Sequence, residues 1–207
     1  MPHRHLTELL HRLPELSACR ESILGAYHAL RDCFQSGGKI LLCGNGGSAA
    51  DADHWAGELL KGFCKRRPLS AKARGKLRPA IAAKLQGALP AIPLTSFPAA
   101  STAFGNDVDP GLAYAQLTSA LGRRGDVFVG LSTSGNAKNV CAAAEVARAR
   151  GMKVIALTAA GGGKLKGLSD VCICAPAAET YRAQEYHLPV YHCLSLMLEE
   201  NFFGEGP

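Results

Sequence analysis

A histidine and a glutamate four residues apart, His54 and Glu58, follow a glycine-rich turn in this chain. Residues at this spacing share one face of a helix. The pair could therefore act as a base with its partner or as half of a metal site. Alone, such a pair is more often an ordinary surface contact, so its meaning depends on what else the chain places beside it.

The turn before this pair predicts a binding place for an anion. Residues 44–48 read Gly-Asn-Gly-Gly-Ser and follow the short apolar run 40–42. Glycines let backbone N–H groups approach a ligand closely, and the start of the following helix adds a partial positive charge. We therefore expect one segment to supply both a phosphate-sized cradle and the His54/Glu58 pair.

A second polar turn, residues 132–136, reads Ser-Thr-Ser-Gly-Asn and follows an apolar strand-like run. It offers three hydroxyls, an amide side chain and a helix start, which together suit a phosphate. A helix cap needs only one hydroxyl, so we favour phosphate binding. Neither glycine turn matches a dinucleotide fingerprint or the Lys-Ser/Thr ending of a P-loop, and this disfavours nucleotide cofactors.

A further polar cluster lies in the C-terminal helical pattern, where Gln184, Glu185, His187 and His192 fall within nine positions. Gln184 and His192 are eight residues apart, so they share one helical face two turns apart. A histidine among apolar neighbours is commonly a hydrogen-bonded core residue. The cluster therefore leaves a functional and a structural interpretation open.

Alternating strand and helix patterns must position these residues. Helical periodicity over 5–36, interrupted near Pro14, predicts an N-terminal helical lead-in within residues 1–36. Strands are expected at 39–43, 89–95, 126–131, 153–158 and 171–175, and further helices at 48–62, 110–121, 138–150 and 179–203, the last bent near Pro189.

This order predicts an α/β fold: a doubly wound, mainly parallel five-stranded sheet flanked by helices, forming one domain over 1–207. Both polar turns fall at the carboxyl ends of strands, where such sheets bind ligands. The two turns are therefore expected to meet in one site.

The net charge of +6 is concentrated in one segment. Residues 59–106 hold nine Lys and Arg and no acid, whereas the rest of the chain has 14 basic and 17 acidic residues. We expect a basic insertion at 64–88 with a short helix near 79–86. A solvated surface is its simplest role, and attraction of an anionic substrate is the second. Nucleic acid is not an expected partner, because no aromatic residues interleave with the charges.

The eight cysteines fit neither a zinc finger nor a disulfide framework, so we expect reduced, mostly buried thiols. Cys172 and Cys174 are expected to point to opposite faces of a strand. No apolar run approaches the roughly 20 residues that span a bilayer. The N-terminus also lacks an apolar signal core, so a cytoplasmic protein without a membrane partner is expected.

Taken in order, these motifs resemble the phosphoheptose isomerases of the sugar-isomerase (SIS) fold. The resemblance runs from the first strand almost to the C-terminus, and an ordered set of motifs is more specific than any one of them. The set comprises the turn 44–48, His54 with Glu58, Asn106-Asp107, Gly122-Arg123 with Gly125-Asp126, the turn 132–136, the run 151–155, Arg182-Ala183-Gln184-Glu185, His187 and His192.

The resemblance implies an aldose–ketose isomerase that interconverts sedoheptulose 7-phosphate and D-glycero-D-manno-heptose 7-phosphate through an enediol. It implies a homotetramer with active sites between subunits, Glu58 as the base and His192 as the acid. Some family members bind Zn²⁺, one per subunit, through residues matching His54, Glu58, Gln184 and His192. Substrate or phosphate contacts are implied for Asn45, Gly46, Gly47, Ser48, Asp107, Ser132, Thr133, Ser134, Asn136 and Gln184.

Three features depart from the family pattern. Ala137 stands where a serine is common, Tyr181 stands where an acidic residue is frequent, and the basic insertion is long. These changes leave the implied acid/base pair intact but alter positions around the implied substrate. They also keep an alternative open, a non-catalytic SIS protein that binds a phosphosugar or a replication initiator.

Overall fold

The computed structural model describes residues 3–204, and its centre is a five-stranded, wholly parallel sheet in the order β2-β1-β3-β4-β5. The predicted doubly wound sheet is therefore confirmed, and each expected strand exists. The predicted domain limits, 1–207, extend past the described residues at both ends. The strands are β1 (Ile40–Cys43), β2 (Ala91–Pro93), β3 (Val127–Leu131), β4 (Lys153–Thr158) and β5 (Val171–Cys174).

Most expected helices are present, and Pro14 does interrupt the lead-in, because a short 3₁₀ turn begins there. The helices are α1 (His3–Arg12), α2 (Arg20–Gln35), α3 (Gly47–Leu60), α4 (Ala71–Arg74), α5 (Pro79–Ala82), α6 (Pro98–Asp107), α7 (Ala113–Leu121), α8 (Lys138–Ala149), α9 (Gly163–Leu168) and α10 (Thr180–Phe203). The 3₁₀ turns are η1 (Pro14–Cys19), η2 (Leu94–Ser96) and η3 (Pro110–Leu112).

Two helices, α6 and α9, have no counterpart in the sequence prediction. Helix α6 buries none of its residues, so it lacks the apolar periodicity that reveals a packed helix. Helix α9 has six residues, of which only Leu165 is buried, and it starts at the last of three consecutive glycines, residues 161–163. Short or unburied helices leave little periodic signal in a sequence.

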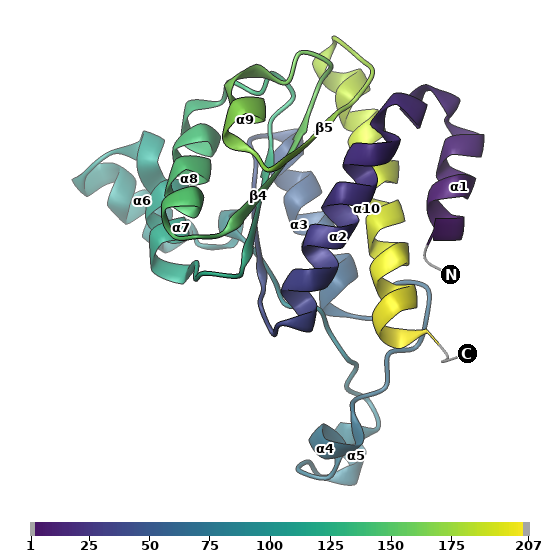
Figure 1. Cartoon of the computed structure of the whole chain (residues 1–207). Coiled ribbons are helices and arrows are strands. Elements are labelled where there is room, and N and C mark those ends of the chain that lie inside the picture. The colour runs from purple at the N-terminus through teal and green to yellow at the C-terminus, as the bar shows by residue number, and fades with distance from the viewer. Residues whose placement is uncertain (1–2, 205–207) are drawn as a thin grey trace.

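The sheet separates two apolar cores, because successive strand residues point to opposite faces. Ile40 and Leu42 of β1 pack with α1, α2, α3 and α10, whereas Leu41 and Cys43 pack with α7, α8 and α9. Figure 1 shows this three-layer arrangement, with α8 and α9 on one side of the strands and α2 and α10 on the other. All four β1 side chains are buried, as expected for a central parallel strand.

The strand order places a topological switch point between β1 and β3, which are neighbours in the sheet. The chain leaves β1 toward β2 on one side and leaves β3 toward β4 on the other, so the loops that follow β1 and β3 part there. Open α/β sheets bind ligands in the crevice that this divergence creates. The loops concerned are the two polar turns that the sequence singled out.

The basic insertion projects from the body as a separate arm that carries α4 and α5 (Figure 1). The expected helix at 79–86 is shorter than predicted, Pro79–Ala82, and a second short helix precedes it. An isolated antiparallel bridge between Pro68 and Gln86 closes the base of the arm. Most of its residues are exposed, so local turns rather than a core hold its helices.

All eight cysteines are free thiols and five are buried, as predicted. The expectation that Cys172 and Cys174 point to opposite faces is wrong, because their Sγ atoms lie 3.5 Å apart. Residues two apart in a strand share a face. Over the described residues 3–204, no helix is both long enough and apolar enough to cross a membrane.

Candidate active site

The turns after β1 and β3 meet in a cavity of about 410 Å³ at the carboxyl end of the sheet. Ser48 and Ser132 are nearly buried in its wall, and Gln184 reaches it from α10. The predicted meeting of the two polar turns is therefore confirmed. The lining residues are Asn45, Gly46, Gly47, Ser48, Leu131, Ser132, Thr133, Ser134, Ala137, Thr180 and Gln184.

The second turn depends on a glycine that no other residue could replace without strain. Gly135 has a φ of 64°, and a Cβ at this position would overlap the carbonyl of Gly162. The turn therefore packs directly against the backbone that begins α9, and Gly135 O accepts a hydrogen bond from Leu165 N at 2.9 Å. This contact holds the hydroxyls of residues 132–134 at the cavity.

Two predicted contact residues are occupied in holding the turns together. The side chains of Asn45 and Asn139 exchange two hydrogen bonds of 2.9 Å, which join the β1 turn to the start of α8. Asn136 donates to Ser134 O at 3.0 Å and accepts from Lys164 N at 3.1 Å, and it does not line the cavity. The structure thus gives the Asn136 side chain a loop-building role.

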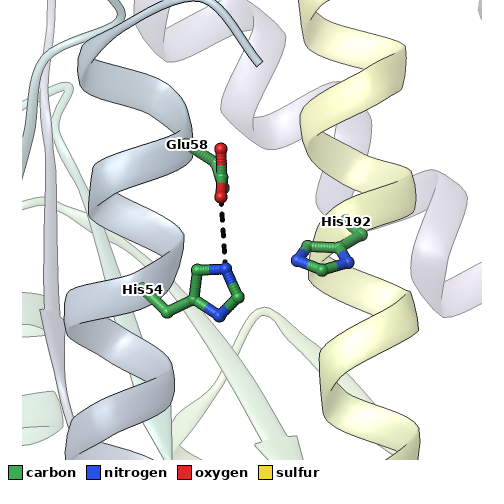
Figure 2. A group of neighbouring side chains, drawn as sticks. All are labelled: His54, Glu58 and His192. Atoms are coloured by element: carbon green, nitrogen blue, oxygen red, sulfur yellow. Dashed lines mark hydrogen bonds and ion pairs between the residues drawn. The ribbon is translucent and has the colours of Figure 1, made fainter. Parts of the chain in front are cut away.

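Helix α3 and helix α10 together place a second group of side chains next to one another. His54 Nε2 lies 3.1 Å from Glu58 Oε1, and His192 reaches toward this pair from α10 (Figure 2). One candidate ligand atom from each of the three lies within 4.8 Å of the others. Lys61 Nζ donates to the other Glu58 oxygen at 3.1 Å. The ordinary surface-contact interpretation of His54 and Glu58 does not account for His192.

The ring of His192 is packed between aromatic neighbours. Its centroid lies 5.1 Å from that of His54 and 5.3 Å from that of Phe63. Burial, and next the nearby His54, hold the pKa of His192 below its usual range, although Glu58 acts in the opposite sense. A neutral imidazole at this position offers one N–H and one lone pair.

These three residues fit a divalent cation. The Nε2 atom of His192 is buried and has no hydrogen-bond partner among the described residues, which is costly for a polar atom. Imidazole nitrogens and a carboxylate oxygen are ligands that Zn²⁺ prefers. Gln184, the fourth predicted ligand, lines the cavity between the two turns beside Gly47 and lies two helical turns before His192, so the structure does not bring it to these three residues.

Two other predicted residues lie elsewhere. His187 is fully buried, and its Nε2 donates to Thr158 O at 3.1 Å, so the core interpretation of this histidine is correct. Asp107 is exposed at the end of α6, where it accepts a hydrogen bond from Asn106 Nδ2 at 2.9 Å. Neither the cavity lining nor the contacts of the described residues connect Asp107 to the site within one chain.

Sequence reasoning missed Phe63, Thr180 and Tyr191, which touch the site from the segment after α3 and from two positions on α10. Thr180 Oγ1 lies 3.4 Å from Thr133 Oγ1, and Tyr191 Oη lies 2.9 Å from His54 Nδ1. Tyr191 is the neighbour of His192, so a search of the residues beside the predicted acid would have found it. Phe63 and Thr180 carry no such signal, because only the packing of distant segments brings them here.

Gly47→Ala tests whether Gln184 is held in place by the first turn. A Cβ on Gly47 would lie 2.5 Å from Gln184 Nε2, so the glutamine has to move away from the cavity wall. We expect kcat/KM to fall about 10- to 100-fold, because small misplacements of binding groups cost that much. The melting temperature should change little, because the displaced atom ends a flexible side chain.

Gly57→Ala is the matched control for that variant. Gly57 lies on the same helix, and a Cβ there would meet nothing within 4 Å. Steady-state kinetics and thermal unfolding are measured for both variants, and Gly57→Ala should match the unsubstituted protein in both. Unchanged kinetics in Gly47→Ala would show that Gln184 contributes nothing at this position.

The sequence matches the model of the SIS domain over residues 4–159. It is 41% identical to the phosphoheptose isomerase of Methylibium petroleiphilum over 186 residues, which are 88% of this chain and 84% of that protein. It is 45% identical to the phosphoheptose isomerase of Thiobacillus denitrificans over 171 residues, 81% of this chain and 77% of that protein.

Solved structures agree with these sequence matches. The phosphoheptose isomerase of Neisseria gonorrhoeae has a TM-score of 0.75 at 35% identity, covering 95% of this chain and 96% of that one. The Francisella tularensis phosphoheptose isomerase has a TM-score of 0.77 at 31% identity, with 91% of each chain covered. By sequence and by fold, this chain belongs to the phosphoheptose isomerase family of SIS-domain proteins.

Proposed function

We propose that this chain is an aldose–ketose isomerase that interconverts sedoheptulose 7-phosphate and D-glycero-D-manno-heptose 7-phosphate. The observation that carries the proposal is the meeting of Glu58 and His192, a carboxylate and an imidazole from two helices, within the three-residue group around His54. The cavity between the two turns begins at the start of the helix that carries Glu58. A binding group and an acid/base pair thus share one scaffold.

The phosphate would bind in the cavity between the two turns. Hydroxyls of Ser48, Ser132 and Ser134 line it, and the N-terminus of α3 adds a favourable dipole. Ser48 and His54 are separated by about 9 Å along the helix axis, from a rise of about 1.5 Å per residue. An extended seven-carbon chain can bridge this separation, so phosphate binding would position the carbonyl end.

The chemical step is a proton transfer between two neighbouring carbons. The Glu58 carboxylate takes the proton from the carbon beside the carbonyl while His192 supplies a proton to the carbonyl oxygen, and an enediol forms. The imidazole then takes the proton of the other enediol hydroxyl. Glu58 returns its proton to the former carbonyl carbon. The double bond has moved by one carbon, and both side chains have regained their starting states.

We also propose a divalent cation, Zn²⁺, as a cofactor of this site. His54, Glu58 and His192 would hold it, and Gln184 would become a fourth ligand only if its side chain moved away from Gly47. When bound, it would supply positive charge that stabilises negative charge on the substrate oxygen. Support comes from the ligand set and from the unpartnered nitrogen of His192.

We propose that the enzyme is a cytoplasmic homotetramer with active sites between subunits. The position of Asp107 supports this arrangement, because the residue is exposed and separate from the site within one chain. Helix α6, which carries it, buries none of its residues against the rest of the protein. If a neighbouring copy packs on α6, Asp107 of one subunit would lie beside the substrate in the active site of the other.

An isomerisation assay tests the function. The purified protein is incubated with sedoheptulose 7-phosphate, with and without added Zn²⁺, and formation of the aldose is followed by NMR. We expect turnover, and we expect a chelator to lower it. Tight phosphosugar binding without turnover under either condition would instead favour the non-catalytic alternative, for which an acid/base pair has no use.

A further inference from the structure

A short chain of polar contacts lies behind His54, on the side away from Glu58. Tyr191 Oη is 2.9 Å from His54 Nδ1 and donates to Asp51 Oδ1 at 3.3 Å. On its other side, His54 Nε2 faces Glu58 Oε1 at 3.1 Å. Asp51, Tyr191, His54 and Glu58 therefore form one continuous series, of which the mechanism above uses only the last two.

The chemistry of these groups determines where the protons lie. An ionised carboxylate only accepts hydrogen bonds, and a tyrosine has a single proton to donate. If the Tyr191 proton points to Asp51, the phenol oxygen must accept from His54, so the His54 proton is on Nδ1. In a neutral ring the lone pair of His54 Nε2 then faces the Glu58 carboxylate, and two acceptors this close are held together by a second proton on the ring or by a metal cation.

The opposite arrangement of protons would leave no free ligand atom between His54 and Glu58. If Tyr191 donated to His54 Nδ1, the imidazole proton would be on Nε2 and would bind Glu58. Neither Nε2 nor that carboxylate oxygen would then be free for a metal ion. An ionised Asp51 opposes this arrangement, because its oxygen would face the lone pairs of the phenol without a proton between them.

We propose that Asp51 and Tyr191 are positioning residues that keep the His54 proton on Nδ1 and thereby present Nε2 to a divalent cation. The proposal rests on the proposed function for the identity of that cation. Groups that hold the other nitrogen of a metal-bound histidine fix its tautomer and ring orientation and raise its affinity for the metal.

The packing around the phenol suits this role. Tyr191 is fully buried, and its ring stacks on Trp55 with centroids 5.6 Å apart and an angle of 18° between the planes. Asp51 lies three residues before His54 on α3, so a single helix presents both groups to the phenol. The hydroxyl of Tyr191 therefore has little freedom to turn away from either partner.

Two substitutions test the proposal without requiring turnover. Asp51→Asn introduces an amide that can donate to the phenol oxygen, so the Tyr191 proton turns toward His54. Tyr191→Phe removes the hydroxyl but keeps the ring stacked on Trp55. Zn²⁺ affinity of the metal-free proteins is measured by competition with a chromophoric chelator. We expect both variants to bind Zn²⁺ about 10- to 100-fold more weakly than the unsubstituted protein.

Asp53→Asn is the matched control, because it makes the same carboxylate-to-amide change on the same helix. Asp53 accepts a hydrogen bond from Thr95 Oγ1 and belongs to no part of the site. Its Zn²⁺ affinity should equal that of the unsubstituted protein. Circular dichroism and the melting temperature of all the proteins exclude loss of folding as the cause.

Nitrogen-15 NMR of the histidine side chains supplies a second readout. The metal-free protein should show His54 protonated on Nδ1, and Asp51→Asn should shift the proton to Nε2. A His54 proton on Nε2 in the unsubstituted protein, or equal Zn²⁺ affinity in all the proteins, would overturn the proposal. If the two variants lose Zn²⁺ affinity but the unsubstituted protein isomerises no heptose phosphate, the proposed function is contradicted. The roles proposed for Asp51 and Tyr191 would still stand.

Discussion

Glu58→Gln is expected to lower kcat by about 10²- to 10⁴-fold, the range that a positioned general base contributes. Glutamine keeps the size of the side chain but cannot take a proton from carbon. The cavity between the two turns is ten residues away along α3, so the phosphate should still bind. The expected pattern is therefore a large loss in turnover with retained affinity for the phosphosugar.

Initial rates and calorimetric titration with sedoheptulose 7-phosphate measure the two quantities separately. Glu145→Gln provides the matched control, because Glu145 is exposed on α8, across the sheet from the site. That variant should be fully active. Full activity in Glu58→Gln would remove Glu58 from the mechanism and with it the assignment of the acid/base pair.

Glu199→Gln is expected to destabilise the fold by about 3–5 kcal/mol, the cost of breaking a buried ion pair by removing one charge. Both Glu199 and Arg67 are 1% exposed, and Arg67 Nε donates to Glu199 Oε1 at 2.8 Å. Backbone N–H groups of residues 63–65 also donate to this carboxylate. The substitution would leave a guanidinium buried without its counter-charge.

The same network connects the arm to helix α3, which carries the proposed base. Arg67 donates to the carbonyls of Leu59 at 2.8 Å and Glu58 at 3.1 Å, at the end of α3. It thereby satisfies carbonyls that the helix itself leaves without partners. Glu199 lies on α10, as does His192. The Arg67–Glu199 ion pair therefore connects α3, which carries the proposed base, to α10, which carries the proposed acid.

Chemical unfolding of Glu199→Gln beside Glu21→Gln measures the effect. Glu21 has a side chain that is 86% exposed, so its variant should change the free energy of unfolding by about 1 kcal/mol or less. A loss below about 1 kcal/mol in Glu199→Gln would show that hydrophobic packing alone holds this region.

The difference between the native protein and Glu199→Gln should also depend on pH. Burial by itself raises the pKa of Glu199, but hydrogen bonds from Phe63 N, Cys64 N and Arg67 outweigh it, so the net pKa is lowered. A lowered carboxyl pKa gives stability that is complete above the unfolded value, about 4.3. That stability disappears as the pH falls through the folded pKa. The difference between the two proteins should therefore shrink below about pH 4.

Secondary structure was predictable where side-chain burial is periodic. The strand at 153–158 matches β4 residue for residue, and the break at Pro14 follows from the missing N–H of proline. Helix α6 escaped prediction because it buries nothing. Simple strand geometry would have predicted correctly that Cys172 and Cys174 share one face of β5.

The chain by itself determined the chemistry that is available: two polar turns after buried strands, a His/Glu pair on one helical face, and a histidine on the last helix. Residue types and short spacings encode these features, because local backbone geometry sets which side chains share a face. Tertiary structure alone decided which of them meet. Packing α3 against α10 placed His192 at the pair, left Asp107 apart, and brought Asp51 and Tyr191 behind His54. Contacts between segments more than a hundred residues apart depend on how layers pack, and no local pattern records that.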